Sequence, residues 1–431
     1  MKATRKTTQA RPPRRWRTPP PLTRGSAETL EGMEILREVG GESGLLLWQS
    51  YRNVMFWATA EPGERAALFA PEASRRRLAE LLTADVPAEI ADSLVEIGRM
   101  MGAPEATAGE TIADACRGIS EWAEAAGHEA TALAYTQAAA LSAPRDATIA
   151  LAVGQISRRR GEQARAETWF RHAIMIGRQT GDWESYARAY IALGNMLLLR
   201  GNFPGAHRMH IKALRAARRK GLTPIQGMAA HDLFVIATET GRNAQAEEYA
   251  RMASRAYGPD HPRLPVLAHD LAYYWMNQGY FSQVMPIFLS LEGRFENDPG
   301  TKIAVRAHIA RAAGGIGDRA TFRRYFTETV RMSKDSIYEG RISDSFLELA
   351  MGASNLGEWD RAEQAAEHAL EVAQQRGQAK VAIEAESVLD AVRSGRRVEH
   401  AKTERAQVSR STQAFADQLV ELLTATATAG A

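Results

Sequence analysis

The stretch IALGNMLLLRGNFPGAHRMHIKAL, from Ile191 to Leu214, decides the fold. Its apolar residues are spaced for a helix, yet Gly194 stands inside that helix and Gly201 ends it. Glycine in a helix interior costs roughly 1 kcal/mol relative to alanine, so Gly194 needs a packing reason. A second apolar helical stripe follows Gly201. The stretch therefore predicts two helices joined by a glycine turn.

Glycines like Gly201 recur along the chain at spacings of 34, 40, 40, 38, 38, 40 and 38 residues. They are Gly127, Gly161, Gly201, Gly241, Gly279, Gly317, Gly357 and Gly395. A period in this range is typical of a helical solenoid. Each repeat is expected to contain a helix A, a glycine in the left-handed conformation, a helix B and a loop.

Small residues keep register with these glycines. Seven positions before the glycine lie Ser120, Gly154, Gly194, Ala272, Ala310 and Ala350; five after it lie Ala132, Ala166, Ala206, Ala246 and Ala362; twelve after it lie Ala139, Ala173, Ala213, Ala253 and Ala369. Small residues at fixed positions let two helices approach closely where they cross. We therefore expect Gly194 to let helix B lie against helix A.

Larger residues are expected to fill the space between the small ones, namely Phe170, Phe288 and Phe326. The register also has faults, because Phe234, Val284 and Phe322 occupy positions that are small in other repeats. We expect wider or re-angled helix packing at these three places.

The pattern Tyr190-x2-Leu193-Gly194-x2-Leu197 with Ala206 resembles the tetratricopeptide repeat family, as does Val153-Gly154 with Ala166-x3-Phe170 and Ala173. The resemblance covers roughly residues 111–395. It implies an all-α fold, a right-handed α-α superhelical solenoid with a helical N-terminal cap. The connector GPDHP, residues 258–262, followed by LAHDLAYYWMNQGYF resembles the longer repeats of kinesin light chains and of bacterial signalling proteins of the family.

The chain divides into four expected parts. Residues 1–27 form a basic tail with eight Lys or Arg and no acid, expected to be disordered; residues 28–110 an N-terminal helical cap or docking region; residues 111–395 a solenoid of about seven helical hairpins plus a final helix; and residues 396–431 a C-terminal helix and frayed tail.

Both ends of the predicted solenoid leave alternatives open. About four helices fit residues 28–110, with helix starts at Pro71 and Pro87, and they form either a cap or a dimer or docking module built on Trp48 and Trp57. A helix over residues 403–424 places Phe415, Leu419 and Leu422 on one side. It is expected to cap the last repeat or to pair with a second chain.

Composition narrows the class of protein. The 431 residues are 45% hydrophobic and 24% charged, which fits a folded chain, and no apolar run approaches the roughly 18 residues of a membrane span. The single Cys116 excludes an intramolecular disulfide framework and fits a reducing cytoplasm. We expect a cytoplasmic protein that does not enter a membrane and, from its Arg and Ala bias, comes from a bacterium.

Enzyme signatures are missing from the sequence. It contains no G-x-x-x-x-G-K-[ST], G-x-S-x-G or H-E-x-x-H, so we expect no catalysis, no cofactor and no metal. His207 and His210 are too few for a metal site, and His210 falls in a core position. AHDL occurs twice, and its histidines, His231 and His269, both lie ten residues before a turn glycine. They are therefore expected to form a short ladder on the inner wall.

The A helices of such solenoids line a concave groove. The residues that we expect to contact a peptide or partner protein there are Gln155, Arg158, Arg188, Asn195, His231, His269, Tyr273, Arg311 and Met351. Asn195 matches the asparagine that peptide-binding members of the family use against a ligand backbone. The lysines of the family's carboxylate clamp are missing beside it, which argues against that ligand.

These observations favour a non-catalytic protein-interaction scaffold or signalling adaptor that binds a peptide or partner protein through the concave surface. A homodimer is also open. The alternative is a nucleic-acid-associated regulator whose basic tail gives weak, salt-dependent attachment; deletion of residues 1–27 should then abolish retention on nucleic acid. A third class is an enzyme of unrecognised type, and stoichiometric metal in the purified protein would support that hypothesis.

Overall fold

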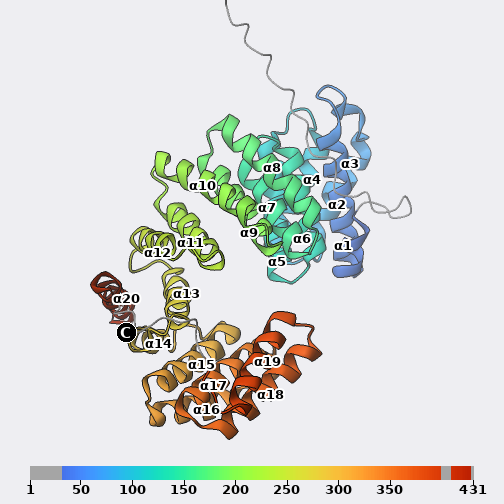
Figure 1. The fold of residues 1–431 in the computed structure, drawn as a ribbon. Helices are drawn as coiled ribbons and strands as arrows, with labels where there is room; N and C mark the ends of the chain where they lie inside the picture. The colour runs from blue at the N-terminus through green and yellow to red at the C-terminus, as the bar shows by residue number, and fades with distance from the viewer. Residues whose placement is uncertain (1–31, 399–408, 429–431) are drawn as a thin grey trace, which may run out of the picture. The chain divides into compact units, whose positions relative to one another are not determined.

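The computed structural model describes residues 32–398 and 409–428, and these residues form α-helices and two short 3-10 helices without a strand. The fold class is all-α, built from antiparallel helical hairpins stacked as a solenoid, as the sequence predicts. The chain separates into two compact units, residues 1–225 and residues 226–431, which we call unit 1 and unit 2 (Figure 1). Each unit is described by itself.

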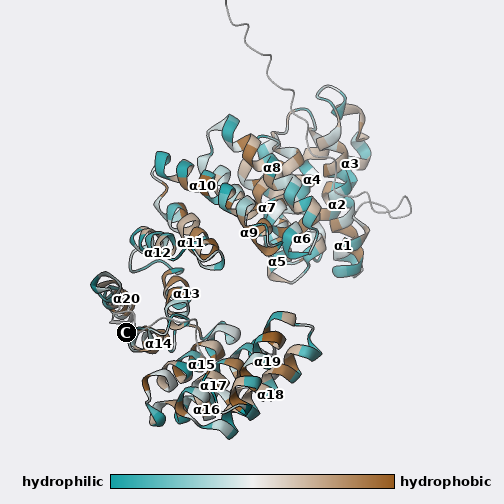
Figure 2. Ribbon diagram, viewed as in Figure 1, coloured by the Kyte–Doolittle hydropathy of each residue, from teal (hydrophilic) through white to brown (hydrophobic). Residues whose placement is uncertain are grey.

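Unit 1 begins with four helices that precede the glycine-punctuated repeats. Its helices are α1 (Met33–Glu38), α2 (Gly41–Thr59), the 3-10 helix η1 (Arg65–Ala67), α3 (Pro71–Thr83), α4 (Ala88–Gly102), α5 (Gly109–Ala125), α6 (Glu129–Ser142), α7 (Ala147–Arg159), α8 (Gln163–Thr180), α9 (Trp183–Leu199) and α10 (Phe203–Lys220). Neighbours in sequence pack on each other from α3 to α10. Figure 2 shows that these helices carry both apolar and polar residues, as partly exposed helices do.

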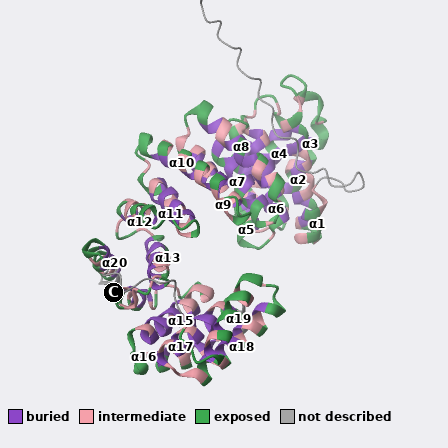
Figure 3. Cartoon of the chain, in the orientation of Figure 1, coloured by how far each residue is buried: buried purple, intermediate pink, exposed green. Residues whose placement is uncertain are grey.

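Unit 2 continues the hairpins and ends with a helix that returns to earlier ones. The helix α11 (Thr223–Glu239) starts at the last residues of unit 1 and is followed by α12 (Asn243–Tyr257), α13 (Leu264–Met276), α14 (Phe281–Leu291), α15 (Pro299–Ile316), α16 (Arg319–Met332), the 3-10 helix η2 (Ser336–Arg341), α17 (Ile342–Leu356), α18 (Trp359–Gln375), α19 (Ala379–Arg393) and α20 (Arg410–Thr428). Buried residues concentrate on α15 and α17 in this unit (Figure 3).

All eight turn glycines adopt the left-handed conformation, with φ between 65° and 93°. The residue after each glycine donates its backbone N–H to a carbonyl five residues earlier, as Asn202 does to Leu197 at 2.9 Å. This is the Schellman arrangement, which satisfies carbonyls at a helix end. A side chain at such a glycine would be strained, so the predicted glycine turns are confirmed.

The crossing of A and B helices explains Gly194. A Cβ atom built on this glycine would lie 2.3 Å from Nε2 of His210, which is fully buried on α10. Gly154 likewise faces Phe170, with 2.5 Å from a built Cβ to the ring. The alanines predicted at the two other crossing positions are buried to 0% exposure: Ala132, Ala139, Ala166, Ala173, Ala206, Ala213, Ala246, Ala253, Ala362 and Ala369. Close helix approach is therefore the reason for the small residues.

The register fault at Phe322 is accommodated by a neighbouring glycine rather than by wider packing. Phe322 is fully buried, and its ring lies near Gly352, 3.1 Å from a built Cβ atom. In that region α15 and α17 approach so closely that a Cβ built on Gly314 would lie 2.3 Å from the carbonyl oxygen of Gly352. The expected plug Phe326 is only half-buried, so Phe322 fills the interior in its place.

The N-terminal helices pack on the first repeat. The helix α3 begins at Pro71, and Pro87 is the N-cap of α4. The carboxylate of Glu38 accepts the backbone N–H groups of Ala130 and Thr131 at 2.8 and 2.7 Å, which places an anion at the start of α6. Whether this region acts as a cap stays a prediction.

The alternative prediction for residues 28–110 was a dimer or docking module built on Trp48 and Trp57, and the burial of Trp57 argues against it. Trp57 is fully buried, and its indole N–H donates to the carbonyl of Pro104 at 2.7 Å. It is therefore part of the interior and is not exposed for a partner.

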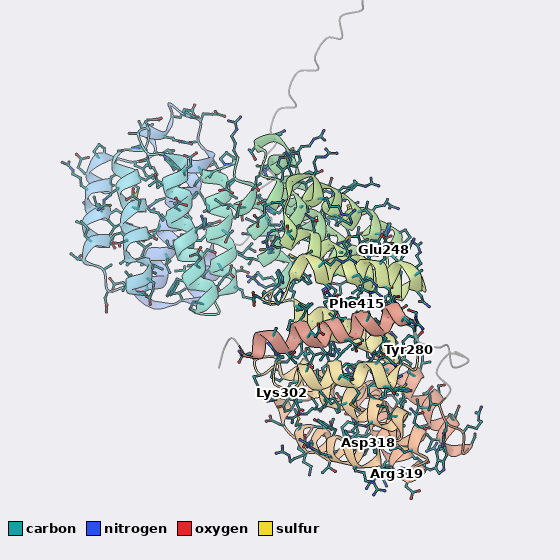
Figure 4. All side chains as sticks on the ribbon, turned by 90° about the vertical axis from the view of Figure 1, so that its left-hand side faces the viewer. Glu248, Tyr280, Lys302, Asp318, Arg319 and Phe415 are labelled. Carbon is teal, nitrogen blue, oxygen red and sulfur yellow. The ribbon has the colours of Figure 1, made fainter. Side chains whose placement is uncertain are left out.

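The C-terminal helix lies where the sequence did not place it. The helix α20 packs on α13 and α14, several helices before the last repeat, and Figure 4 shows it crossing this part of unit 2 with Phe415 labelled. Phe415, Leu419 and Leu423 are buried, whereas the predicted Leu422 is only half-buried. The expectation that this helix caps the last repeat is wrong, because its apolar face fits a groove near the middle of the chain.

Two further predictions concern the basic tail and membrane spans. The basic tail, residues 1–27, lies outside the described residues, so its proposed contact with nucleic acid stays a prediction. Among the helices that the structure describes, none is both long and apolar enough to cross a membrane.

Candidate functional site

The predicted groove residues fall in both units. In unit 1, Gln155 and Arg158 are exposed on α7, and Arg188 and Asn195 are half-buried on α9. Arg188 donates to the carboxylate of Glu184 on the same helix at 2.9 Å. These four side chains give unit 1 an amide and cationic surface along its A helices.

The other five predicted residues lie on A helices of unit 2. His231 comes from α11, His269 and Tyr273 from α13, Arg311 from α15 and Met351 from α17. Contacts between neighbouring helices bring the first four of these side chains into one polar cluster. We call this cluster the polar wall and define it as His231, His269, Asp270, Tyr273, His308, Arg311 and Glu348.

Asp270 joins the two predicted histidines. Nε2 of His231 lies 3.0 Å from one carboxylate oxygen, and Nδ1 of His269 lies 3.2 Å from the other. With Asp270 ionised, both imidazoles donate to it, and Nδ1 of His231 faces the hydroxyl of Tyr257 at 3.4 Å. The predicted histidine ladder therefore exists, with a carboxylate as its link.

His308 extends the polar wall and was missed by the sequence reasoning. Its ring centroid lies 5.1 Å from that of His269 and 4.9 Å from that of Tyr273. Nε2 of His269 and Nδ1 of His308 are buried without a hydrogen-bond partner. Buried polar atoms of this kind are costly, so they mark a place that merits a functional explanation.

Arg311 is placed differently from the prediction. It is 1% exposed, and its guanidinium donates to the carboxylate of Glu348 on α17 at 2.6 Å. A buried charge needs such a partner, so this arginine connects two A helices instead of facing a ligand. His231 is also buried, whereas Tyr273 is 38% exposed and remains available on the surface of the wall.

Burial and neighbouring charges shift the pKa values of several side chains in the polar wall. Burial alone would raise the pKa of Asp270, but the hydrogen bonds from His231 and His269 outweigh it and hold that pKa well below its usual range. Burial lowers the pKa of His308 well below its usual value, so its ring is neutral at pH 7. The negative charge of Glu348, together with burial, raises the pKa of the Tyr273 hydroxyl. Tyr273 is therefore a hydrogen-bonding group and not an acid at neutral pH.

Metal binding finds no support in the described part of the chain, where no group of three or more His, Cys, Asp or Glu side chains could hold an ion. His231 uses Asp270 of the next repeat instead of its neighbour Asp232, because adjacent residues on a helix face different directions. His210 packs in the interior against Gly194, as expected.

The residues that were missed carried a faint signal. Asp270 stands in the second AHDL motif, and Glu348 lies nine residues before Gly357 while Arg311 lies six before Gly317. A search for opposite charges at different register positions of neighbouring repeats would have paired Arg311 with Glu348 and His231 with Asp270. His308 carries no sequence signal of its own, because a histidine in an apolar helix is usually only a core residue.

The fold and the wall define a helical-repeat protein that exposes side chains of its A helices. Residues 145–219 match the sequence profile of a family described as tetratricopeptide repeat, and this part of the chain consists of tetratricopeptide repeats. The match covers α7 to α10, including the segment with Gly194 and Gly201. Its likeness to the longer repeats of kinesin light chains stays a prediction. No curated protein sequence matches the chain.

The solved structures that are similar to this chain share little sequence identity with it. BtubC (BKLC) from P. vanneervenii is 13% identical, with 61% of this chain and 91% of that chain covered and a TM-score of 0.34. The TPR2AB domain of yeast Sti1, solved in a pHSP90 complex, is 13% identical, with 66% and 99% covered and a TM-score of 0.25. A signal transduction ATPase with a tetratricopeptide repeat sensor from Pyrococcus horikoshii is 14% identical, with 76% and 43% covered and a TM-score of 0.30. These scores are too low to support an argument about function.

Proposed function

We propose that this protein is a non-catalytic scaffold that binds a peptide or a partner protein through the exposed side chains of its A helices. Repeats of this type form extended surfaces that serve binding. A signalling adaptor in a bacterial cytoplasm is the specific form that the connector at residues 258–262 favours.

The observation that carries the proposal is the polar wall of unit 2. Its charged and imidazole groups are held by one another, through His231, Asp270 and His269 on one side and through Arg311 and Glu348 on the other. Tyr273 stands exposed beside them. A surface whose polar groups are already fixed loses little entropy on binding, which favours recognition of an extended peptide.

Selection from a random peptide library on the full-length chain tests this function. Peptides enriched by the wild type should bind Tyr273→Glu or Asn195→Glu at least tenfold more weakly. Leu82→Glu is the matched control, because Leu82 is 62% exposed on α3, which precedes the A helices of the repeats. Arg311 is left unchanged, because removing it would strand the buried carboxylate of Glu348.

Two results would contradict the proposal. One is a selection that enriches no peptide above the level of an unrelated helical protein. The other is a set of peptides that bind both groove variants and the control with the affinity of the wild type. Circular dichroism of each variant ensures that a loss of binding does not come from unfolding.

A further inference from the structure

The helix α20 shows how a groove of this solenoid holds a helix. Near its start, the hydroxyl of Thr412 donates to Glu247 at 3.2 Å, and the carbonyl of Ser411 accepts from Arg251 at 2.8 Å. The same Arg251 guanidinium lies over the ring of Phe415, 4.4 Å from its centroid. That ring meets the indole of Trp275 edge to face at 5.8 Å. One Glu–Arg pair on α12 thus fixes both the first turn and the aromatic anchor.

The rest of α20 follows the groove towards α14. Leu419 and Leu423 are fully buried, and Arg294 donates to the carbonyl of Leu423. We call this place, between the B helices α12 and α14 with the A helix α13 beneath, the filled groove. Its occupant is an amphipathic helix with Thr412 in the first turn, Phe415 as anchor and two leucines behind it.

Unit 1 contains a cavity of about 270 Å³ between α8, α9 and α10. Its lining is Glu167, Arg171, Ile174, Tyr190, Leu193, Met196, Leu197, Arg200, Met209 and Lys212. Glu167 pairs with Arg171 at 2.6 Å and with Arg200 at 3.3 Å. Lys212 lies over the ring of Tyr190 at 5.2 Å. We call this place the open groove.

The two grooves occupy the same register of their repeats. Glu167 and Arg171 lie six and ten residues after Gly161, as Glu247 and Arg251 lie six and ten after Gly241. On the A helices, Leu197 and Trp275 each lie four residues before a turn glycine. On the following B helices, Met209 and Ile287 each lie eight residues after one. The open groove therefore repeats the Glu–Arg pair and the apolar floor that hold α20.

We infer that the open groove binds an amphipathic helix from a partner protein, with Ser or Thr in its first turn and a phenylalanine or leucine anchor three to four residues later. Glu167 accepts from the hydroxyl, Arg171 donates to a first-turn carbonyl, and Ile174, Leu197 and Met209 contact the anchor. The roles of Glu167, Arg171 and Leu197 follow from the contacts that Glu247, Arg251 and Trp275 make with α20. Ile174 and Met209 line the cavity beside them.

The charge of the groove defines the partner further. Three cations, Arg171, Arg200 and Lys212, stand around a single acid, Glu167. Among its described contacts with α20, the filled groove has two cations, Arg251 and Arg294, and one acid, Glu247. An occupant of the open groove is therefore acidic on the flanks of its apolar stripe, which makes its binding salt-dependent. The surface shares no residue with the groove residues of the proposed function, so either can fail alone.

A synthetic peptide with the sequence of residues 409–428 is the probe, because it has the required pattern and two acids, Asp417 and Glu421. Fluorescence anisotropy with the full-length protein should show saturable binding that weakens with salt. Met209→Glu places a charge on the groove floor and should weaken binding at least tenfold. Lys212→Glu changes only an exposed side chain and should weaken it several-fold. Arg208→Glu, an exposed site on the same helix that does not line the cavity, is the matched control and should change nothing.

A second peptide carrying Phe415→Ala should lose at least tenfold in affinity. The inference is overturned if the wild type shows no saturable binding, or if Met209→Glu and Lys212→Glu bind as tightly as Arg208→Glu. It is also overturned if Arg251→Glu abolishes binding while Met209→Glu keeps it, since the peptide then replaces α20 in the filled groove. Tyr273→Glu should leave peptide binding unchanged, which separates this result from the proposed function.

Discussion

The open groove of unit 1 and the filled groove of unit 2 are built from the same positions of the repeat, yet only one holds a helix of the chain. Both have a Glu–Arg pair one turn apart on the first B helix. They differ in the floor, where Leu197 stands in one and Trp275 in the other. The comparison teaches that the same repeat positions can form a groove in both units, and that the side chains at these positions decide its occupant.

The inner walls differ in the same way. In unit 1 the predicted groove residues Gln155 and Arg158 are exposed and Arg188 pairs within its own helix. In unit 2 the polar wall ties neighbouring A helices together through Asp270 and Glu348. In unit 2, ionisable residues therefore hold neighbouring repeats together. The same kind of substitution can be made in each unit and its effects compared.

Removing the anchor of the filled groove should have the largest effect. Phe415→Ala deletes a fully buried ring and its contact with Arg251, which should weaken α20 docking by about 3–5 kcal/mol. Hydrogen exchange of the α20 amides should then rise to the rate of an exposed helix, while exchange in α8 to α10 stays unchanged. Unchanged protection of α20 would mean that Phe415 is not its anchor.

The crossing beneath the open groove is tighter than the one beneath the filled groove, where Ala272 replaces the glycine. Gly194→Ala should destabilise unit 1 by about 1–3 kcal/mol, because the new methyl group meets the His210 ring. Ala272→Gly should cost about 1 kcal/mol through helix propensity. Urea unfolding followed by tryptophan fluorescence measures both, and equal effects would contradict the difference in packing.

Acid should distinguish the buried histidines of the two units. Burial lowers the pKa of His308 in unit 2 and lowers that of His172 in unit 1 to about 4. Each ring is neutral in the fold but binds a proton in the unfolded chain below about pH 6.5, so the free energy of unfolding falls as pH drops from 6.5. The slope is at most about 1.4 kcal/mol per pH unit for each histidine.

His308→Phe should flatten this slope for unit 2, and His172→Phe should do so for unit 1. Asp270 adds nothing between pH 5 and 7, because its lowered pKa gives stability that is lost only below about pH 4. Urea unfolding at pH 5, 6 and 7 measures the slopes. A variant that keeps the wild-type slope would show that its histidine is protonated in the fold.

The smallest expected effect comes from giving the open groove the tryptophan that stands at the same position in the filled groove. Leu197→Trp gives the open groove the indole of the filled groove, and an aromatic pair with the peptide anchor contributes about 0.5–1.5 kcal/mol. Binding of the residue 409–428 peptide should therefore tighten about two- to tenfold in anisotropy titrations. The Phe415→Ala peptide should gain nothing from this variant, and an equal gain would show that the indole acts without the anchor.

The sequence was sufficient for features that depend on local backbone. The eight glycine turns and the small residues at Gly154 and Gly194 follow from dihedral angles and crossing distances, which repeat in every hairpin. The histidine ladder was also visible, because His231 and His269 share a register position.

Features that join different register positions were beyond the sequence. Arg311 was expected on the groove surface, but its charge is buried because Glu348 of the next repeat reaches it. The position of α20 depends on contacts between residues up to 165 apart, such as Thr412 and Glu247. An apolar stripe predicts that a helix packs against the rest of the protein. It does not predict which of several similar grooves the helix occupies.

The long return of α20 has a consequence for synthesis of the chain. Arg251 and Ser411, which meet at the filled groove, are 160 residues apart. At typical translation rates the groove residues of α12 leave the ribosome roughly 10 to 30 s before their partner does. During that interval the floor around Trp275 is uncovered while the N-terminal repeats can already fold. The filled groove is thus completed late in synthesis, and any helix with the right pattern can reach it first.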